Sequence, residues 1–133
     1  MHCFRENAAL FHRNTQLTEF LAKGDVIINS TGTGTLGRVG IICDEVEPIV
    51  PDSHITVIRT SPLILSHYIY CVLKENQPVL ENSGEGSTNQ KELRPGTLIN
   101  FLVPLPPMNE QKRITKMITE SFSSIKAIAQ ILN

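Results

Sequence analysis

The sequence predicts an α+β fold with short strands and helices, followed by one long C-terminal amphipathic helix. Short β-branched apolar runs bounded by loops are typical of strands, and three occur at 26–29, 38–43 and 54–59. From Asn109 onward there is neither Gly nor Pro, and apolar residues recur every three or four positions, as in an amphipathic helix. The 133 residues suffice for one domain with its own core. We therefore divide the chain into residues 1–107, the domain, and 108–133, the long helix.

The first half of the chain is expected to contain one short helix and three strands. The helix is predicted near Thr18–Lys23, before the Gly-Asp pair that precedes the first strand. The strands are predicted at Val26–Asn29, Arg38–Cys43 and His54–Arg59. The acidic segment between the second and third strands, Asp44–Asp52, contains two prolines and is predicted to be a loop.

The second half is expected to alternate between buried and solvent-exposed segments. Leu63–Lys74 has the length and apolar spacing of a buried helix. The small polar residues of Asn82–Gln90 predict a loop, and Leu98–Leu105 is predicted to be a strand that ends at prolines. In the long helix, Asn109 is expected to cap the N-terminus, with Glu110 near the positive end of the helix dipole.

Composition restricts the class of protein without identifying a ligand. The net charge of −1 permits DNA binding but does not argue for it. No run of about 18 apolar residues is present, so we expect a cytoplasmic protein without a membrane partner. Cys3, Cys43 and Cys71 are expected to be reduced, the last two as small core residues. Neither these cysteines nor the four histidines show the spacing of a metal site, so no metal is predicted.

The segment STGTGTLGRVG contains the pattern G-x-G-x-x-G at Gly32, Gly34 and Gly37. A dinucleotide-binding loop needs a helix to begin within this pattern, because the helix N-terminus holds the pyrophosphate. Here the continuation RVGIIC is typical of a strand, and the lysine of a phosphate-binding P-loop is absent. Two interpretations remain. The glycines either satisfy turn geometry alone, or they let backbone amides, threonine hydroxyls and Arg38 approach phosphates or base edges.

Two further polar segments have residue types that are found in binding or catalytic sites. In Ser87–Lys91, Asn and Gln amides are suited to adenine and Lys to guanine or phosphate, although a solvated loop explains the same composition. Asp52, Ser53 and His54 have the residue types of a catalytic triad, but consecutive residues at the start of a strand cannot all face one another. No catalytic residue is predicted.

The long helix carries an apolar stripe that continues to the end of the sequence. The stripe either packs against the domain or pairs with another helix. Its residues are Ile114, Met117, Ile118, Phe122, Ile125, Ile128 and Leu132.

Four segments, taken in order, resemble the target-recognition domain of type I restriction–modification specificity subunits. They are GDVIINSTGTGTLGRVGII, DSHITVIR, GSTNQKEL and FLVPLPPMNEQKRI. The resemblance runs from about Gly24 to Ile114 and continues into the long helix. It implies a curved, twisted mixed sheet that reads one half of a split target in double-stranded DNA. It also implies a non-catalytic subunit, whose helix pairs with a second helix and docks methyltransferase subunits, and through them restriction subunits. S-adenosylmethionine, Mg and ATP are then expected only on those partners.

With this resemblance, the polar segments become the predicted DNA contacts. Gly32, Gly34 and Gly37 are expected to shape the loop. The predicted contact residues are Thr33, Thr35, Arg38, Ser53, His54, Ser87, Thr88, Asn89, Gln90 and Lys91.

The chain departs from the family pattern, which has two recognition domains and two helices, and its N-terminal part is short. We therefore expect a fragment, a truncated gene product or a half-subunit. In the half-subunit interpretation, two copies pair through the long helix as a homodimer and read a twofold-symmetric target. Two other classes stay open: an assembly protein that binds methyltransferase or specificity subunits through its helix without reading DNA, and a cofactor enzyme.

Overall fold

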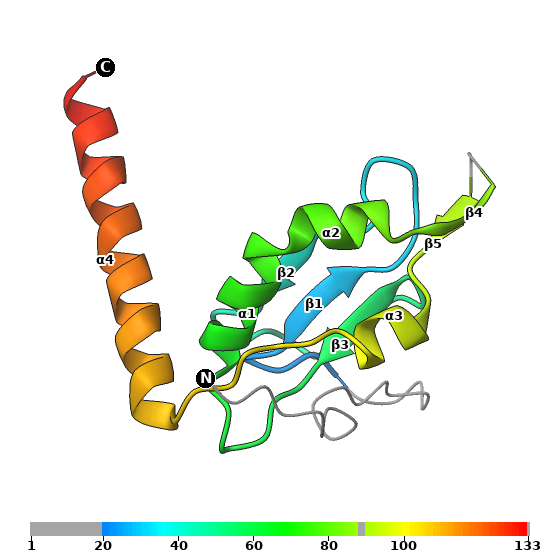
Figure 1. Cartoon of the computed structure of the whole chain (residues 1–133), viewed down its shortest axis with the longest axis horizontal. Coiled ribbons are helices and arrows are strands. Elements are labelled where there is room, and N and C mark those ends of the chain that lie inside the picture. The colour runs from blue at the N-terminus through cyan, green and yellow to red at the C-terminus, as the bar shows by residue number, and fades with distance from the viewer. Residues whose placement is uncertain (1–19, 88–89, 133) are drawn as a thin grey trace.

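The computed structural model describes residues 20–87 and 90–132, and it confirms the α+β class (Figure 1). Strand β1 (Val26–Asn29) is the centre of a three-stranded antiparallel sheet, with β2 (Val39–Ile41) on one side and β3 (Ile55–Ile58) on the other. A second, two-stranded sheet is the hairpin of β4 (Glu85–Ser87) and β5 (Gln90–Glu92). The expected strand–loop–strand arrangement around the glycine motif is therefore confirmed.

One face of the three-stranded sheet forms the core of the domain. Val26 and Ile28 lie on this face of β1 and are fully buried, because residues two apart in a strand point to the same side. Helix α1 (Ser66–Glu75) packs against this face, and Figure 1 shows α1 and α2 (Gln77–Asn82) in front of β2. The buried apolar core is completed by Leu36, Val39, Ile58, Tyr68, Ile69, Leu73, Leu80, Leu93, Leu98 and Val103.

The outer edge of β2 is covered by side chains from the junction of α1 and α2. An edge strand has outward-facing backbone groups that require partners. The Val39 amide donates a hydrogen bond to Oε1 of Gln77 at 3.2 Å, and Nζ of Lys74 donates to the same oxygen at 2.7 Å. The Val39 carbonyl accepts a hydrogen bond from Nζ of Lys74 at 3.5 Å, so both backbone groups of Val39 have side-chain partners.

Two expectations about the second half were wrong. Leu98–Leu105 is not a strand, because α3 (Pro95–Ile99) is a short helix and the segment after it has no ladder. Proline at the first helical turn favours a helix start, and Pro104, Pro106 and Pro107 cannot donate ladder hydrogen bonds. Asn82–Gln90 is not a loop throughout, because α2 (Gln77–Asn82) ends in it and β4 begins in it.

Three local expectations were also corrected. Phe20–Lys23, the described part of the helix expected near Thr18–Lys23, contains a turn and no helix. Cys43 is exposed rather than in the core, because it follows β2 at the sheet margin. Helix α4 (Met108–Ile131) begins one residue before Asn109, with Pro107 at the N-cap and no side-chain cap. Proline suits that position because the first helical amides lack intrahelical acceptors in any case.

Helix α4 extends away from the rest of the domain (Figure 1). It has 24 residues, close to the expected 25, and contacts α1 near its own N-terminus. Among the described residues, no helix is long and apolar enough to cross a membrane.

Candidate nucleic-acid interface

The glycine motif forms a closed loop between β1 and β2. Gly32, Gly34 and Gly37 all have positive φ, at 99°, 81° and 79°, a region that L-residues with side chains rarely adopt. Two main-chain hydrogen bonds close the loop, and both join Asn29 to residues just before β2. The Gly37 amide donates to the Asn29 carbonyl at 2.8 Å, and the Asn29 amide donates to the Arg38 carbonyl at 3.0 Å. Since the chain continues into β2, the motif lacks the helix N-terminus that a dinucleotide-binding loop uses.

Close packing fixes this loop against the helical layer. A Cβ atom added to Gly37 would lie 2.6 Å from the backbone nitrogen of Glu81 in α2, whereas one added to Gly34 would meet nothing within 4 Å. Within the loop, the Thr35 hydroxyl donates to the Thr31 carbonyl at 3.2 Å, so it is engaged internally. Thr33 and Gly34 are exposed at the loop surface.

The β4–β5 hairpin is joined to the glycine loop through main-chain contacts. The Leu93 amide donates to the Ser30 carbonyl at 2.8 Å, and Thr31 pairs with Glu92 in an isolated antiparallel bridge. The Gly32 amide also donates to the Lys91 carbonyl at 3.4 Å. These contacts hold the base of the hairpin beside the loop, while all described residues of β4 and β5 remain exposed.

The turn before β3 lies at the same end of the sheet. The Ser30 amide donates to the His54 carbonyl at 2.8 Å, and the Ser30 hydroxyl is hydrogen bonded to the Thr56 hydroxyl. The Asp52 carboxylate accepts a hydrogen bond from the His54 amide at 2.6 Å and one from the Ser53 hydroxyl at 3.5 Å. Asp52 therefore stabilises the turn, and the three residues form no nucleophile–base pair.

Three segments that are far apart in the sequence thus meet at one end of the three-stranded sheet. Each of them contacts the segment Ser30–Gly32, which connects β1 to the glycine loop. The predicted contact residues found exposed there are Thr33, Arg38, Ser53, His54, Ser87, Gln90 and Lys91. Thr35 is half-buried, and Thr88 and Asn89 lie outside the described residues.

The charge of this end is mixed rather than strongly basic. Arg38, Lys91 and Arg94 contribute positive side chains, and all three are exposed. Acidic side chains lie among them: Glu85 forms an ion pair with Arg94 at 3.0 Å, and Glu92 neighbours Lys91 in β5. A ligand for this surface would be held largely by hydrogen bonds, with few ionic contacts.

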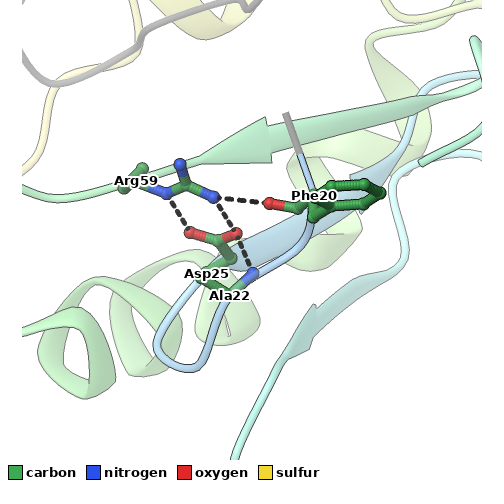
Figure 2. A network of polar contacts seen from close by, with 4 residues as sticks. All are labelled: Phe20, Ala22, Asp25 and Arg59. Atoms are coloured by element: carbon green, nitrogen blue, oxygen red, sulfur yellow. Dashed lines mark hydrogen bonds and ion pairs between the residues drawn. The ribbon is translucent and has the colours of Figure 1, made fainter. Parts of the chain in front are cut away.

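The opposite end of the sheet contains a polar network that sequence analysis missed. Asp25, which is 1% exposed, accepts two hydrogen bonds from the Arg59 guanidinium, at 2.8 Å from Nε and 2.7 Å from Nη2 (Figure 2). The Ala22 amide donates to the same carboxylate at 2.8 Å, and Nη2 of Arg59 donates to the Phe20 carbonyl at 3.0 Å. The sequence does contain a signal for this ion pair, because Asp25 directly precedes β1, Arg59 directly follows β3, and these two strands pair with each other.

The apolar stripe of α4 is largely exposed. Ile114 packs against the core of the domain, but the side chains farther along the helix leave it. The exposed fraction is 69% for Phe122, 61% for Ile125 and 80% for Leu132. Among the other stripe residues, Ile118 is half-buried and Met117 and Ile128 are exposed.

No group of three or more potential metal ligands was found in residues 20–87 and 90–132. Burial raises the pKa of the Cys71 thiol, which lowers its reactivity as a nucleophile at neutral pH.

The sequence and the fold are similar to those of known proteins. The family model of the type I restriction modification DNA specificity domain matches residues 9–133. The chain belongs to this family. Among solved structures, the HsdS subunit from Thermoanaerobacter tengcongensis superposes with a TM-score of 0.67 at 17% identity, over 88% of this chain and 26% of that one. The S subunit of a type I restriction-modification system from M. genitalium gives a TM-score of 0.64 at 16% identity, over 96% of this chain and 35% of that one.

These matches confirm the resemblance and the fold expected from the sequence. The chain spans about a quarter to a third of the length of these two subunits. At such low identity the structural likeness establishes the fold alone.

Proposed function

We propose that this chain recognises double-stranded DNA in a sequence-specific way, as the domain of a type I specificity subunit that reads one part of the target. The observation that carries the proposal is the meeting of three polar segments at one end of the sheet, in a member of a DNA specificity family. The domain itself does no chemistry in this proposal. It directs partner methyltransferase and restriction subunits, which bind S-adenosylmethionine, Mg and ATP.

The β4–β5 hairpin is the element best suited to read base edges. The major groove of B-DNA admits a two-stranded β-ribbon, and every described residue of this ribbon is exposed. The Gln90 amide can pair with adenine, and Lys91 can contact guanine or a phosphate. With the ribbon in the groove, the adjoining glycine loop lies close to the backbone, where Thr33 and Arg38 act as hydrogen-bond donors.

The mixed charge of the surface predicts a shallow dependence of binding on salt. Each phosphate contact contributes about 0.9 to the slope of log K against log salt concentration. Among the exposed cations that the structure describes at this end of the sheet, Arg94 is paired with Glu85, which leaves Arg38 and Lys91 for phosphates. Affinity then depends mainly on hydrogen bonds to bases, which favours specificity over tight non-specific binding.

A selection from random duplexes, followed by salt titration, tests this proposal. We expect enrichment of one defined sequence, and we expect Lys91→Ala to flatten the salt slope by about one unit if Lys91 contacts a phosphate. Lys23→Ala is the matched control, because Lys23 is equally exposed but lies at the opposite end of β1. Equal effects of the two substitutions would contradict the assignment of the surface.

The exposed stripe of α4 supports a second element of the proposal, that this helix is an assembly surface. Apolar side chains as exposed as Phe122 and Ile125 are typical of a helix that pairs with another. A second copy of this chain would supply such a helix and give a twofold-symmetric dimer, and methyltransferase subunits would dock on the pair. Sedimentation should show dimers that Phe122→Asp dissociates, and a monomer at high micromolar concentration would exclude the homodimer.

The alternative function is assembly without DNA reading. It would be supported if the chain formed a tight complex with a methyltransferase subunit while no duplex bound at low salt.

A further inference from the structure

Helix α4 is attached to the domain by a buried polar side chain in its first turn. Gln111 is 1% exposed, although glutamine is usually a surface residue. Its Oε1 accepts a hydrogen bond from the Leu65 amide at 2.9 Å, and its Nε2 donates to the Pro106 carbonyl at 2.9 Å. Both ends of the side-chain amide are therefore engaged.

The two partners of Gln111 belong to different segments. Leu65 is the N-cap residue of α1, and that helix start has no side-chain cap of its own, so Gln111 satisfies an amide there. Pro106 lies in the proline-containing segment that leads into α4. A rotation of α4 about its first turn would break both hydrogen bonds and leave buried polar groups without partners, which is costly.

The other contacts near the start of α4 involve the segment that leads into the helix and the core of the domain. None of them involves the far part of the helix. The Tyr68 hydroxyl donates to the Pro104 carbonyl at 2.9 Å, and Ile114 packs against the core. From Thr119 to Leu132 every residue of α4 is exposed. The direction of this exposed part is consequently set at the first turns.

We propose that Gln111 is a positioning residue that fixes the direction of α4 relative to the domain. Any partner bound along the exposed part of α4 is thereby held in a set orientation to the glycine-loop end of the sheet. The proposal concerns the joint itself and does not depend on DNA binding.

Distance measurements between two spin labels test it in the full chain. One label is placed on exposed Cys43 and the other on Ser124→Cys, with Cys3→Ser and Cys71→Ser removing the remaining thiols. Labelled chains are diluted with unlabelled ones, so that only distances within a chain are recorded. We expect one narrow distance peak, its loss in Gln111→Met, and its retention in the control Gln130→Met, where the glutamine is exposed. A peak equally narrow in Gln111→Met would overturn the proposal.

Gln111→Glu separates hydrogen bonding from packing. A protonated carboxyl can donate one hydrogen bond and accept another, which replaces the two hydrogen bonds of the Gln111 amide, whereas a carboxylate cannot donate to the Pro106 carbonyl. Burial raises the pKa of a carboxyl, so the change is expected between about pH 5 and pH 8. The narrow peak should be present at the acidic end of this range and lost at the alkaline end, while the wild-type peak stays constant. A pH-independent peak in Gln111→Glu, or failure of both variants to fold, would overturn the proposal.

Discussion

The two ends of the three-stranded sheet use similar polar residues in opposite ways. At one end, Asp25 is buried and accepts hydrogen bonds from Arg59 and the Ala22 amide. At the other end, Arg38 and Lys91 have exposed side chains on segments that are held in place by their main chains. The first arrangement uses charge to join two strands of the domain, whereas the second leaves side chains available to a ligand.

This difference shows why residue type alone does not identify a site. Arg59 and Arg38 each stand next to a strand of the same sheet, yet only Arg59 faces a buried carboxylate. The stability of the domain and the binding of DNA should accordingly respond to different substitutions.

The largest effect on stability is expected at Asp25. Asp25→Ala removes a buried carboxylate that accepts hydrogen bonds from the Ala22 amide and from the Arg59 guanidinium, so we expect a loss of about 3 kcal/mol in the free energy of unfolding. Urea denaturation measures this loss. Asp44→Asn, at an exposed acid, should change stability by no more than about 0.5 kcal/mol. If Asp25→Ala lowered the free energy of unfolding as little as Asp44→Asn does, the Asp25 end of the sheet would not have the stabilising role assigned to it.

A smaller effect is expected within the glycine loop itself. Gly37→Ala combines a positive φ with a steric conflict at the Glu81 backbone and should cost about 2 kcal/mol. Gly34→Ala has a similar φ but open space around it and should cost about 1 kcal/mol. Thermal unfolding of the two variants separates close packing from backbone strain. Equal losses would mean that contact with α2 does not hold the loop.

An effect as small as that of Gly34→Ala is expected at Tyr68, which is buried in the core. Tyr68→Phe removes the hydrogen bond to the Pro104 carbonyl and should cost about 1 kcal/mol at neutral pH. Burial raises the pKa of the Tyr68 hydroxyl, so the folded state resists ionisation. The wild type should therefore lose stability as the pH rises above the unfolded value of about 10, and this part of the loss should be absent in Tyr68→Phe. Urea denaturation at several pH values measures this dependence. The same change of stability with pH in the wild type and in Tyr68→Phe would mean that the hydroxyl is solvated.

Strands around the glycine motif could be predicted from sequence because their signals are local. The apolar run at Val26–Asn29 and the RVGIIC continuation were each sufficient, and the predicted bounds of β1 agree with the structure. Leu98–Leu105 was misassigned because a short apolar run does not distinguish strand from helix, and Pro95 favoured the helix. The hairpin within 82–92 was missed because its strands are polar on both faces and lack periodicity.

The candidate site could be predicted only as separate segments. Their meeting at Ser30–Gly32 depends on main-chain contacts between residues far apart in the sequence, which no local pattern encodes. Gln111 lies within the FLVPLPPMNEQKRI segment, but its burial follows from the approach of α4 to α1 and cannot be predicted from the helix alone.

Mapping of amide chemical-shift changes on adding the selected duplex tests the central claim most directly, because both ends of the sheet are observed in one experiment. We expect changes at Thr33, Arg38 and Gln90, with Lys23 and Gly24 unaffected. Changes gathered around Lys23 and Gly24, with none at the glycine loop or the β4–β5 hairpin, would contradict it.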